Sequence, residues 1–176
     1  MKKMLLIGNG VSRKKEEIQK FIEEWQDEIW IFNYAYKEYG KKATRWSGHV
    51  ELIQEANKYK KRYKCNYDIY TNAETIIPHK NFDHLYLFDS GTTALRQALL
   101  EEYDCWLVGY DLGGADIYSP EHYKINKTGW VKRMYQIWFN NQDRIHFIGV
   151  DHSEIFRSRK FWLYYEKYSK GINHLE

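Results

Sequence analysis

Residues 4–12 read MLLIGNGVS, a run of four apolar residues followed by Asn9 between two glycines. Four consecutive apolar residues are typical of a strand buried on both faces, as in a parallel sheet. From Ser12 the pattern becomes charged and periodic, with apolar residues at helical spacing. These apolar residues are Ile18, Phe21, Ile22 and Trp25. The stretch therefore predicts a buried strand, a tight turn and a helix in succession.

The same alternation of apolar strands and amphipathic helices continues along the chain. Further strands are predicted at residues 29–32, 67–71, 84–88, 105–108 and 145–150, and further helices at about 49–62, 92–102, 129–140 and 153–168. Repeated βα units favour a single doubly wound, mostly parallel α/β sheet of the Rossmann-like kind, with helices on both faces. No linker or repeat interrupts the pattern, so residues 1–174 are predicted to form one domain. The irregular stretch at about 112–127 is long enough for a functional loop or lid.

Composition excludes several classes of protein. A net charge of +3 over 176 residues gives no general nucleic-acid-binding surface. The densest basic run, residues 58–64, fits a solvated helix end, with a phosphate or membrane-surface contact as the alternative. Cys65 and Cys105 are too few for a disulfide framework, so we expect a reduced, cytoplasmic compartment. The apolar run at 4–7 is too short for a signal peptide or a transmembrane segment.

Polar and glycine residues gather directly after the predicted strands, where parallel α/β sheets bind their ligands. Glycines let a ligand approach the backbone closely, and the start of a helix favours a phosphate. We therefore predict one crevice that binds a nucleotide or a nucleotide-sugar. The predicted nucleotide-binding residues are Gly8, Asn9, Gly10, Ser12, Asn33, Ser90, Gly91, Thr92, Tyr110 and Asp111.

Each of these motifs also has a plain structural explanation. The first glycine loop can be an ordinary turn from strand to helix, and Ser90 or Thr92 can simply cap a helix. Asn33 fits an Asx turn as well as a ligand contact. Asp111 suits a ribose, a sugar hydroxyl or a metal, but no second carboxylate or histidine follows at ligand spacing, so no metal or other cofactor is predicted. It is the convergence of several loops at one crevice that favours the ligand.

Two histidines are candidates for proton transfer, His122 in the long loop and His152 after the last strand. A surface histidine without a catalytic task is the alternative for both.

The order and spacing of these motifs resemble bacterial sialyltransferases that use CMP-sialic acid. The resemblance covers about the first 150 residues and rests on residues 8–12, Asn33 with the tyrosines after it, the Ser90-Gly91 loop, and the strand that ends in residues 109–111. It implies a variant of the GT-A glycosyltransferase fold. It also implies that Asn9 and Gly10 meet the CMP phosphate, that Asn33 contacts phosphate or base, and that residues 90–92 line the ribose and phosphate.

In that family, sugar transfer needs no metal, a histidine deprotonates the acceptor, and tyrosines support the departing phosphate. His122, Tyr118 and Tyr123 are the residues of this chain that the resemblance offers for these roles, although His122 is displaced from the expected position. The chain is also shorter than a typical member. A non-catalytic protein that sequesters or senses a nucleotide is therefore the alternative function. The 18% aromatic content is compatible with a homo-oligomer, and the aromatic C-terminal stripe fits either the core or a docking surface.

Overall fold

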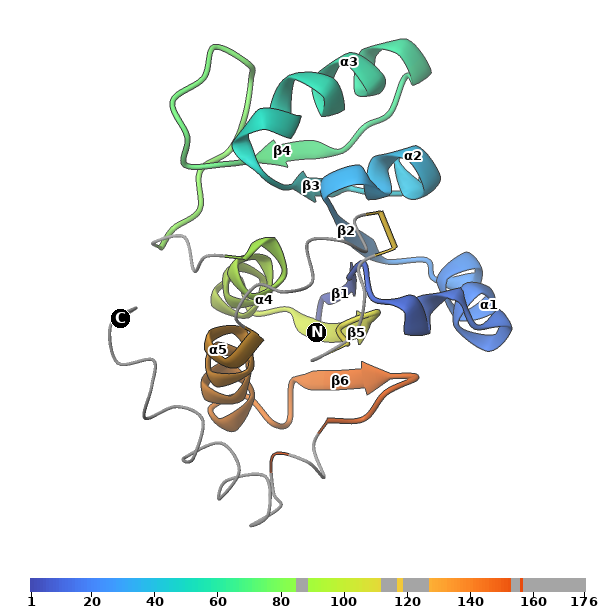
Figure 1. The fold of residues 1–176 in the computed structure, drawn as a ribbon, viewed down its shortest axis with the longest axis vertical. Coiled ribbons are helices and arrows are strands. Elements are labelled where there is room, and N and C mark those ends of the chain that lie inside the picture. The colour runs from blue at the N-terminus through green and yellow to red at the C-terminus, as the bar shows by residue number, and fades with distance from the viewer. Residues whose placement is uncertain (85–88, 112–116, 119–126, 153–155, 157–176) are drawn as a thin grey trace.

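The computed structural model describes residues 1–84, 89–111, 117–118, 127–152 and 156 (Figure 1). Within these residues, six parallel strands form one sheet in the order β4-β3-β2-β1-β5-β6. The strands are β1 (Lys3–Ile7), β2 (Glu28–Phe32), β3 (Arg45–Ser47), β4 (Asp68–Tyr70), β5 (Asp104–Val108) and β6 (Ile145–Ile148). The α-helices are α1 (Glu16–Glu24), α2 (Tyr36–Tyr39), α3 (Ile53–Tyr63), α4 (Ser90–Leu100) and α5 (Lys127–Phe139), and the 3-10 helices are η1 (Val11–Lys14), η2 (Asn33–Ala35) and η3 (Val50–Leu52).

The strand β1 lies at the centre of the sheet, between β2 and β5. Its four apolar residues, 4–7, have no exposed surface. Leu5 is in register with Ile29 of β2 and with Trp106 of β5. Because burying one such side chain contributes about 1.5–3 kcal/mol, this short apolar run is enough to anchor both halves of the sheet.

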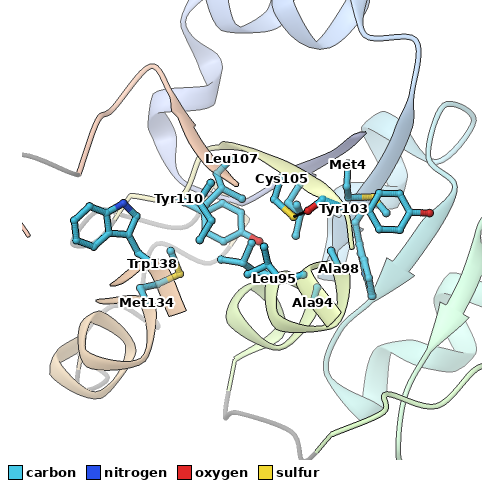
Figure 2. Packing of buried hydrophobic residues seen from close by; sticks show 14 of the residues in the cluster. Met4, Ala94, Leu95, Ala98, Tyr103, Cys105, Leu107, Tyr110, Met134 and Trp138 are labelled. Carbon is cyan, nitrogen blue, oxygen red and sulfur yellow. Dashed lines mark hydrogen bonds between the residues drawn. The ribbon is translucent and has the colours of Figure 1, made fainter. Parts of the chain in front are cut away.

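Successive residues of β1 supply two hydrophobic cores on opposite faces of the sheet. Met4 and Leu6 face the core beneath α4 and α5, whereas the residues that alternate with them face the core beneath α1, α2 and α3. Figure 2 shows the first of these cores, where Leu95 of α4 and Trp138 of α5 pack with buried strand residues. The helices therefore cover both faces, as a doubly wound fold requires.

The chain changes direction across the sheet after β4. The strands β1 to β4 lie side by side in chain order, and the chain then returns past β1 to add β5 and β6 on its other side. The neighbours β1 and β5 therefore form the switch point of the sheet. In open α/β folds, the carboxyl ends of the strands at such a point flank the ligand crevice.

The predicted α/β fold with a parallel sheet is confirmed. The strands predicted at 4–7, 29–32, 67–71, 105–108 and 145–150 correspond to β1, β2, β4, β5 and β6. The helices predicted at 49–62, 92–102 and 129–140 correspond to η3 with α3, to α4 and to α5. The first helix differs from its prediction, because residues 11–14 form η1 and α1 begins only at Glu16. Of the strand predicted at 84–88, residues 85–88 lie outside the described part of the chain.

Neither β3 nor α2 is among the predicted elements. The three residues of β3 include the buried Arg45 and form no apolar run. This strand is held by its parallel neighbours, with Trp46 in register with Ile31 of β2 and Ile69 of β4. Its structure is therefore a product of long-range pairing, which local periodicity does not report.

Two predicted segments fall largely outside the described residues. Of the loop at 112–127, the structure describes 117–118 and Lys127, the first residue of α5. Of the C-terminal helix at 153–168 it describes Phe156, which is buried, its ring centroid 5.2 Å from that of Trp138. This one residue of the aromatic stripe thus belongs to the core. Among the described helices, none has the length and apolar character needed to span a membrane.

Candidate functional site

The two glycine-containing turns after β1 and β5 lie against each other at the switch point. The backbone N–H of Gly8 donates to the Val108 carbonyl at 2.8 Å, and that of Gly10 to the Gly109 carbonyl at 2.9 Å. A β-carbon on Gly8 would lie only 2.5 Å from the Gly109 carbonyl oxygen. Gly109 itself has a φ of +66°, which glycine adopts without strain. Glycine is therefore needed here for the close approach of two backbones.

Asp111 joins the turn after β5 to the turn after β1. Its carboxylate accepts a hydrogen bond from the Ser12 backbone N–H at 2.9 Å and another from the Ser12 hydroxyl. A β-carbon on Gly10 would lie 2.5 Å from this carboxylate. Ser12 and Asp111, both predicted to bind the nucleotide, are therefore brought together. The N–H and the hydroxyl of Ser12 are bonded to a carboxylate of the protein itself.

The Asn9 side chain is held from both sides. Its amide N–H donates to the Phe32 carbonyl at 3.3 Å, and its Oδ1 accepts from the Arg13 guanidinium at 2.9 Å. Arg13 donates from the same nitrogen to the Gly8 carbonyl, also at 2.9 Å. The Asn9 side chain is thus fixed between β2 and η1. The resemblance implies that Asn9 contacts a phosphate, and its backbone N–H, for which the described residues provide no acceptor, is the group left for that contact.

Arg13 is a site residue that the sequence patterns missed. It stands in a charged, periodic stretch where an arginine is expected to face solvent, yet its side chain is fully buried. The same guanidinium donates to Glu38 at 3.1 Å and to the Tyr118 hydroxyl at 2.7 Å. No signal in the local sequence reveals these contacts, because Tyr118 lies 105 residues further along the chain.

Tyr118 is the described member of the predicted catalytic residues. Its hydroxyl accepts from Arg13 and donates to Glu38. Burial and the hydrogen bond to Glu38 raise the pKa of Tyr118, so its phenol stays protonated at neutral pH. His122 and Tyr123, the other two residues, lie outside the described part of the chain.

Asn33 directly follows β2, as the first residue of η2, and lies beside the turn that follows β3. It has a φ of 48°, a left-handed conformation that asparagine tolerates. Its Oδ1 accepts from the His49 backbone N–H at 3.0 Å, and its carbonyl accepts from the Trp46 indole at 2.8 Å. The strand β3, which was not predicted, therefore brings Gly48 and His49 to this end of the sheet.

The start of α4 carries its own carboxylate. Asp89 is the N-cap, and its side chain accepts from the Thr92 backbone N–H at 2.7 Å and from the Thr92 hydroxyl. Burial raises the pKa of Asp89, although hydrogen bonds from Thr92 and the Arg133 guanidinium 3.6 Å away oppose the shift. Asp89, and neither Ser90 nor Thr92, is therefore the residue that caps the helix. Ser90 is buried, whereas Gly91 is partly exposed and its N–H meets no acceptor among the described residues.

Tyr110 connects the switch point to α4. The ring is buried, and its hydroxyl donates to the Gly91 carbonyl at 3.0 Å. Nε2 of the buried His152 lies 2.7 Å from the Tyr110 carbonyl, and because a carbonyl only accepts, Nε2 carries the proton. Burial lowers the pKa of His152 and raises that of Tyr110, so both groups are uncharged at neutral pH. Tyr110 therefore joins the two predicted loops through protein contacts.

The predicted nucleotide-binding residues and Tyr118, all of them described, thus gather at one end of the sheet. Asn9, Gly10, Asn33, Gly91 and Asp111 are all partly exposed there. Within the described residues, no group of three or more His, Cys, Asp or Glu side chains is placed to hold a metal ion. A scan against models of known protein families found no match, and a search of curated proteins found none either.

Proposed function

We propose that this chain binds a nucleotide or a nucleotide-sugar at the carboxyl ends of β1, β2 and β5. The observation that carries the proposal is the coincidence of the switch point with the glycine turns. Doubly wound sheets bind ligands at this position, where the strands diverge and backbone groups are accessible. The site also adjoins the start of α4, through the hydrogen bond of Tyr110 to Gly91.

The groups at this end of the sheet suit a ligand rich in hydrogen-bonding atoms. The backbone N–H groups of Asn9 and Gly91 are donors for which the described residues offer no acceptor. The partly exposed Asp111 carboxylate has lone pairs beyond those that accept from Ser12, which suits a ribose or sugar hydroxyl. Backbone donors for phosphate oxygens beside a carboxylate for hydroxyls fit a sugar-phosphate ligand.

The resemblance to sialyltransferases extends the proposal to metal-independent transfer of a sugar from a CMP-type donor. His122 would then act as general base, and Tyr118 and Tyr123 would support the departing phosphate. One observation favours the alternative of a binding protein without turnover. The Tyr118 hydroxyl is already bonded to both Arg13 and Glu38, so a phosphate would have to displace one of these partners.

Binding is tested by thermal shift and calorimetry of the purified chain with CMP, CMP-sialic acid, UDP- and GDP-sugars and NAD. A ligand that binds the native state raises the melting temperature. We expect a shift with CMP-type ligands that is reduced in Asn33→Ala and Ser90→Ala and retained in Arg62→Ala, a change on the exposed end of α3. Absence of a shift with every nucleotide would contradict the proposal.

Turnover is tested separately, by following the release or transfer of sialic acid from CMP-sialic acid. Transfer that is lost in His122→Ala while CMP still binds would support an enzyme. Binding without release or transfer by the wild type would support the sequestering or sensing protein.

A further inference from the structure

Arg13 is a fully buried cation beside the proposed ligand site. Removing a guanidinium from water is costly unless it is hydrogen-bonded and its charge is balanced. One terminal nitrogen of Arg13 donates to Gly8 and Asn9, and the other donates to Glu38 and Tyr118. The rings of Tyr39 and Tyr118 lie 5.2 and 5.3 Å from the guanidinium carbon, within the range of cation–π attraction.

These partners come from three segments that are distant in sequence. Gly8 and Asn9 belong to the first glycine turn, Glu38 to α2, and Tyr118 to the segment after Asp111. A second bond supports the same junction, because the Ile117 backbone N–H donates to the Asn9 carbonyl at 2.9 Å. Residues 117–118 are thus attached to the first turn by a backbone bond and by the guanidinium.

The geometry suits arginine and no other residue. Two nitrogens of one planar group contact four acceptors in different directions, whereas a lysine ammonium is a point charge with a different reach. Among the described residues, the charge is met by a single carboxylate, Glu38, whose side chain is 42% exposed. Most of the contacts of Arg13 therefore orient neutral groups of the site.

We infer that Arg13 is a positioning residue that fixes Asn9 and clasps residues 117–118 onto the first glycine turn. Its effect on ligand affinity rests on the proposed function, since Arg13 holds the Asn9 side chain and would affect a ligand through the position of Asn9. All of the contacts of the clasp are between groups of the protein, so the clasp can be measured in the free protein.

The test is residue-resolved amide hydrogen exchange by NMR on the full chain without ligand. In Arg13→Met we expect the Ile117 amide to exchange at least about tenfold faster, the effect of losing a charge-assisted hydrogen bond at the junction. The Gly8 and Gly10 amides, which donate to the last residue of β5 and to Gly109 after it, should keep their protection. Lys14→Met is the matched control, because this neighbouring side chain is exposed. Tyr118→Phe removes only the hydroxyl and should accelerate Ile117 exchange in the same direction.

Three results would overturn the inference. Unchanged Ile117 exchange in both Arg13→Met and Tyr118→Phe would show that the clasp does not hold the segment. Equal acceleration at Ile117, Gly8 and Gly10 would show a general loss of stability. Wild-type protection of Ile117 in Arg13→Lys would show that charge alone is enough, without the planar group.

Calorimetry with CMP then tests whether the contacts of Arg13 affect the affinity of the proposed site. We expect Arg13→Met to weaken CMP binding by about tenfold or more and Lys14→Met to leave it unchanged. If the wild-type protein binds neither CMP nor any of the other nucleotides, the proposed function fails, while Ile117 exchange still decides whether Arg13 clasps the segment. If CMP binds the wild type and Arg13→Met equally well, Arg13 does not position the site.

Discussion

Arg13 and Arg45 are both buried in this molecule, at opposite ends of the same sheet. Arg45 begins β3 and pairs with Glu28 at 3.3 Å and Glu101 at 2.8 Å. Its guanidinium also donates to the Tyr103 hydroxyl and lies 5.2 Å from each of the rings of Trp30, Tyr70 and Tyr103. In the described part of the chain, Arg13 has one carboxylate partner, and its other acceptors are a carbonyl, an amide and a phenol.

The difference separates two uses of a buried cation. The partners of Arg45 are charges and rings carried by β2, by β4 and by residues 101–103 between α4 and β5, and Arg45 itself lies in β3, so this cluster joins regular elements. The partners of Arg13 are atoms of the first glycine turn, the exposed Glu38 of α2, and Tyr118 from a distant segment. We therefore expect Arg45 to matter for stability of the whole fold and Arg13 to matter for the shape of one end of it.

The largest effect is expected from Arg45→Met. It leaves the carboxylates of Glu28 and Glu101 without their counter-charge, and both are only partly exposed. We expect the free energy of unfolding in urea to fall by about 3 kcal/mol, at the low end for breaking a buried ion pair. Arg13→Met should cost less, because Glu38 regains water more easily. A larger loss for Arg13→Met would reverse the comparison.

Gly8→Ala tests the backbone contact at the carboxyl end. The new β-carbon would lie 2.5 Å from a carbonyl oxygen of the turn after β5, which has little room to move. We expect a loss of about 2 kcal/mol in the free energy of unfolding. Gly91→Ala is the matched control, since its β-carbon would lie 3.2 Å from the Tyr110 ring and alanine favours the helix. Equal losses in the two variants would argue against the tight contact.

Acid titration tests how much the pair of Arg45 with Glu101 contributes to stability. Burial raises the pKa of Glu101, but hydrogen bonds from Arg45 and Gln97 outweigh it, so the net pKa is below its ordinary value of 4.5. A carboxyl with a lowered folded pKa contributes stability above its unfolded pKa and loses that contribution as pH falls through the folded pKa. The difference in unfolding free energy between wild type and Arg45→Met should therefore shrink below about pH 4.5. A constant difference down to pH 3 would show that Glu101 is not the partner that matters.

The smallest effects are expected from the two aspartates at opposite ends of β5. Asp111→Asn keeps an acceptor for Ser12 but removes the charge, and should cost about 1 kcal/mol. Asp104→Asn affects the pair with His146, whose side chain is 34% exposed, and should cost no more than about 0.5 kcal/mol. Thermal unfolding of both variants at pH 7 measures the difference. A greater loss of stability for Asp104→Asn than for Asp111→Asn would show that the Asp111 charge does not stabilise the carboxyl end of the sheet.

Much of the fold could be predicted because its strands carry a local signal. The run at 4–7 and the apolar residues of β2, β5 and β6 indicate buried parallel strands. The strand β3 has three residues and an arginine, and its structure depends on neighbours on both sides. Short elements of this kind escape prediction because their stability comes from pairing rather than from periodicity.

That the candidate residues meet at one end of the sheet could be predicted, but their contacts could not. The position after each strand brings Asn9, Asn33 and Asp111 to one end of the sheet. The position after a strand does not predict the hydrogen-bond partner of each side chain, and the Asp111 carboxylate accepts from Ser12 of the protein itself. Arg13 has no signal at all, because its burial follows from a tyrosine that only the folded chain places beside it.

The bond between Ser12 and Asp111 also has a consequence for how the chain folds. These residues are 99 positions apart, so the first glycine turn is synthesised long before the groups that complete it. Bringing such distant residues together costs loop-closure entropy and slows folding. The β1–β2 pair closes a much shorter loop and can form earlier. The carboxyl end of the β1–β5 pair is therefore assembled late, and a nucleotide bound at the proposed site would stabilise only chains in which both halves of the sheet have already joined.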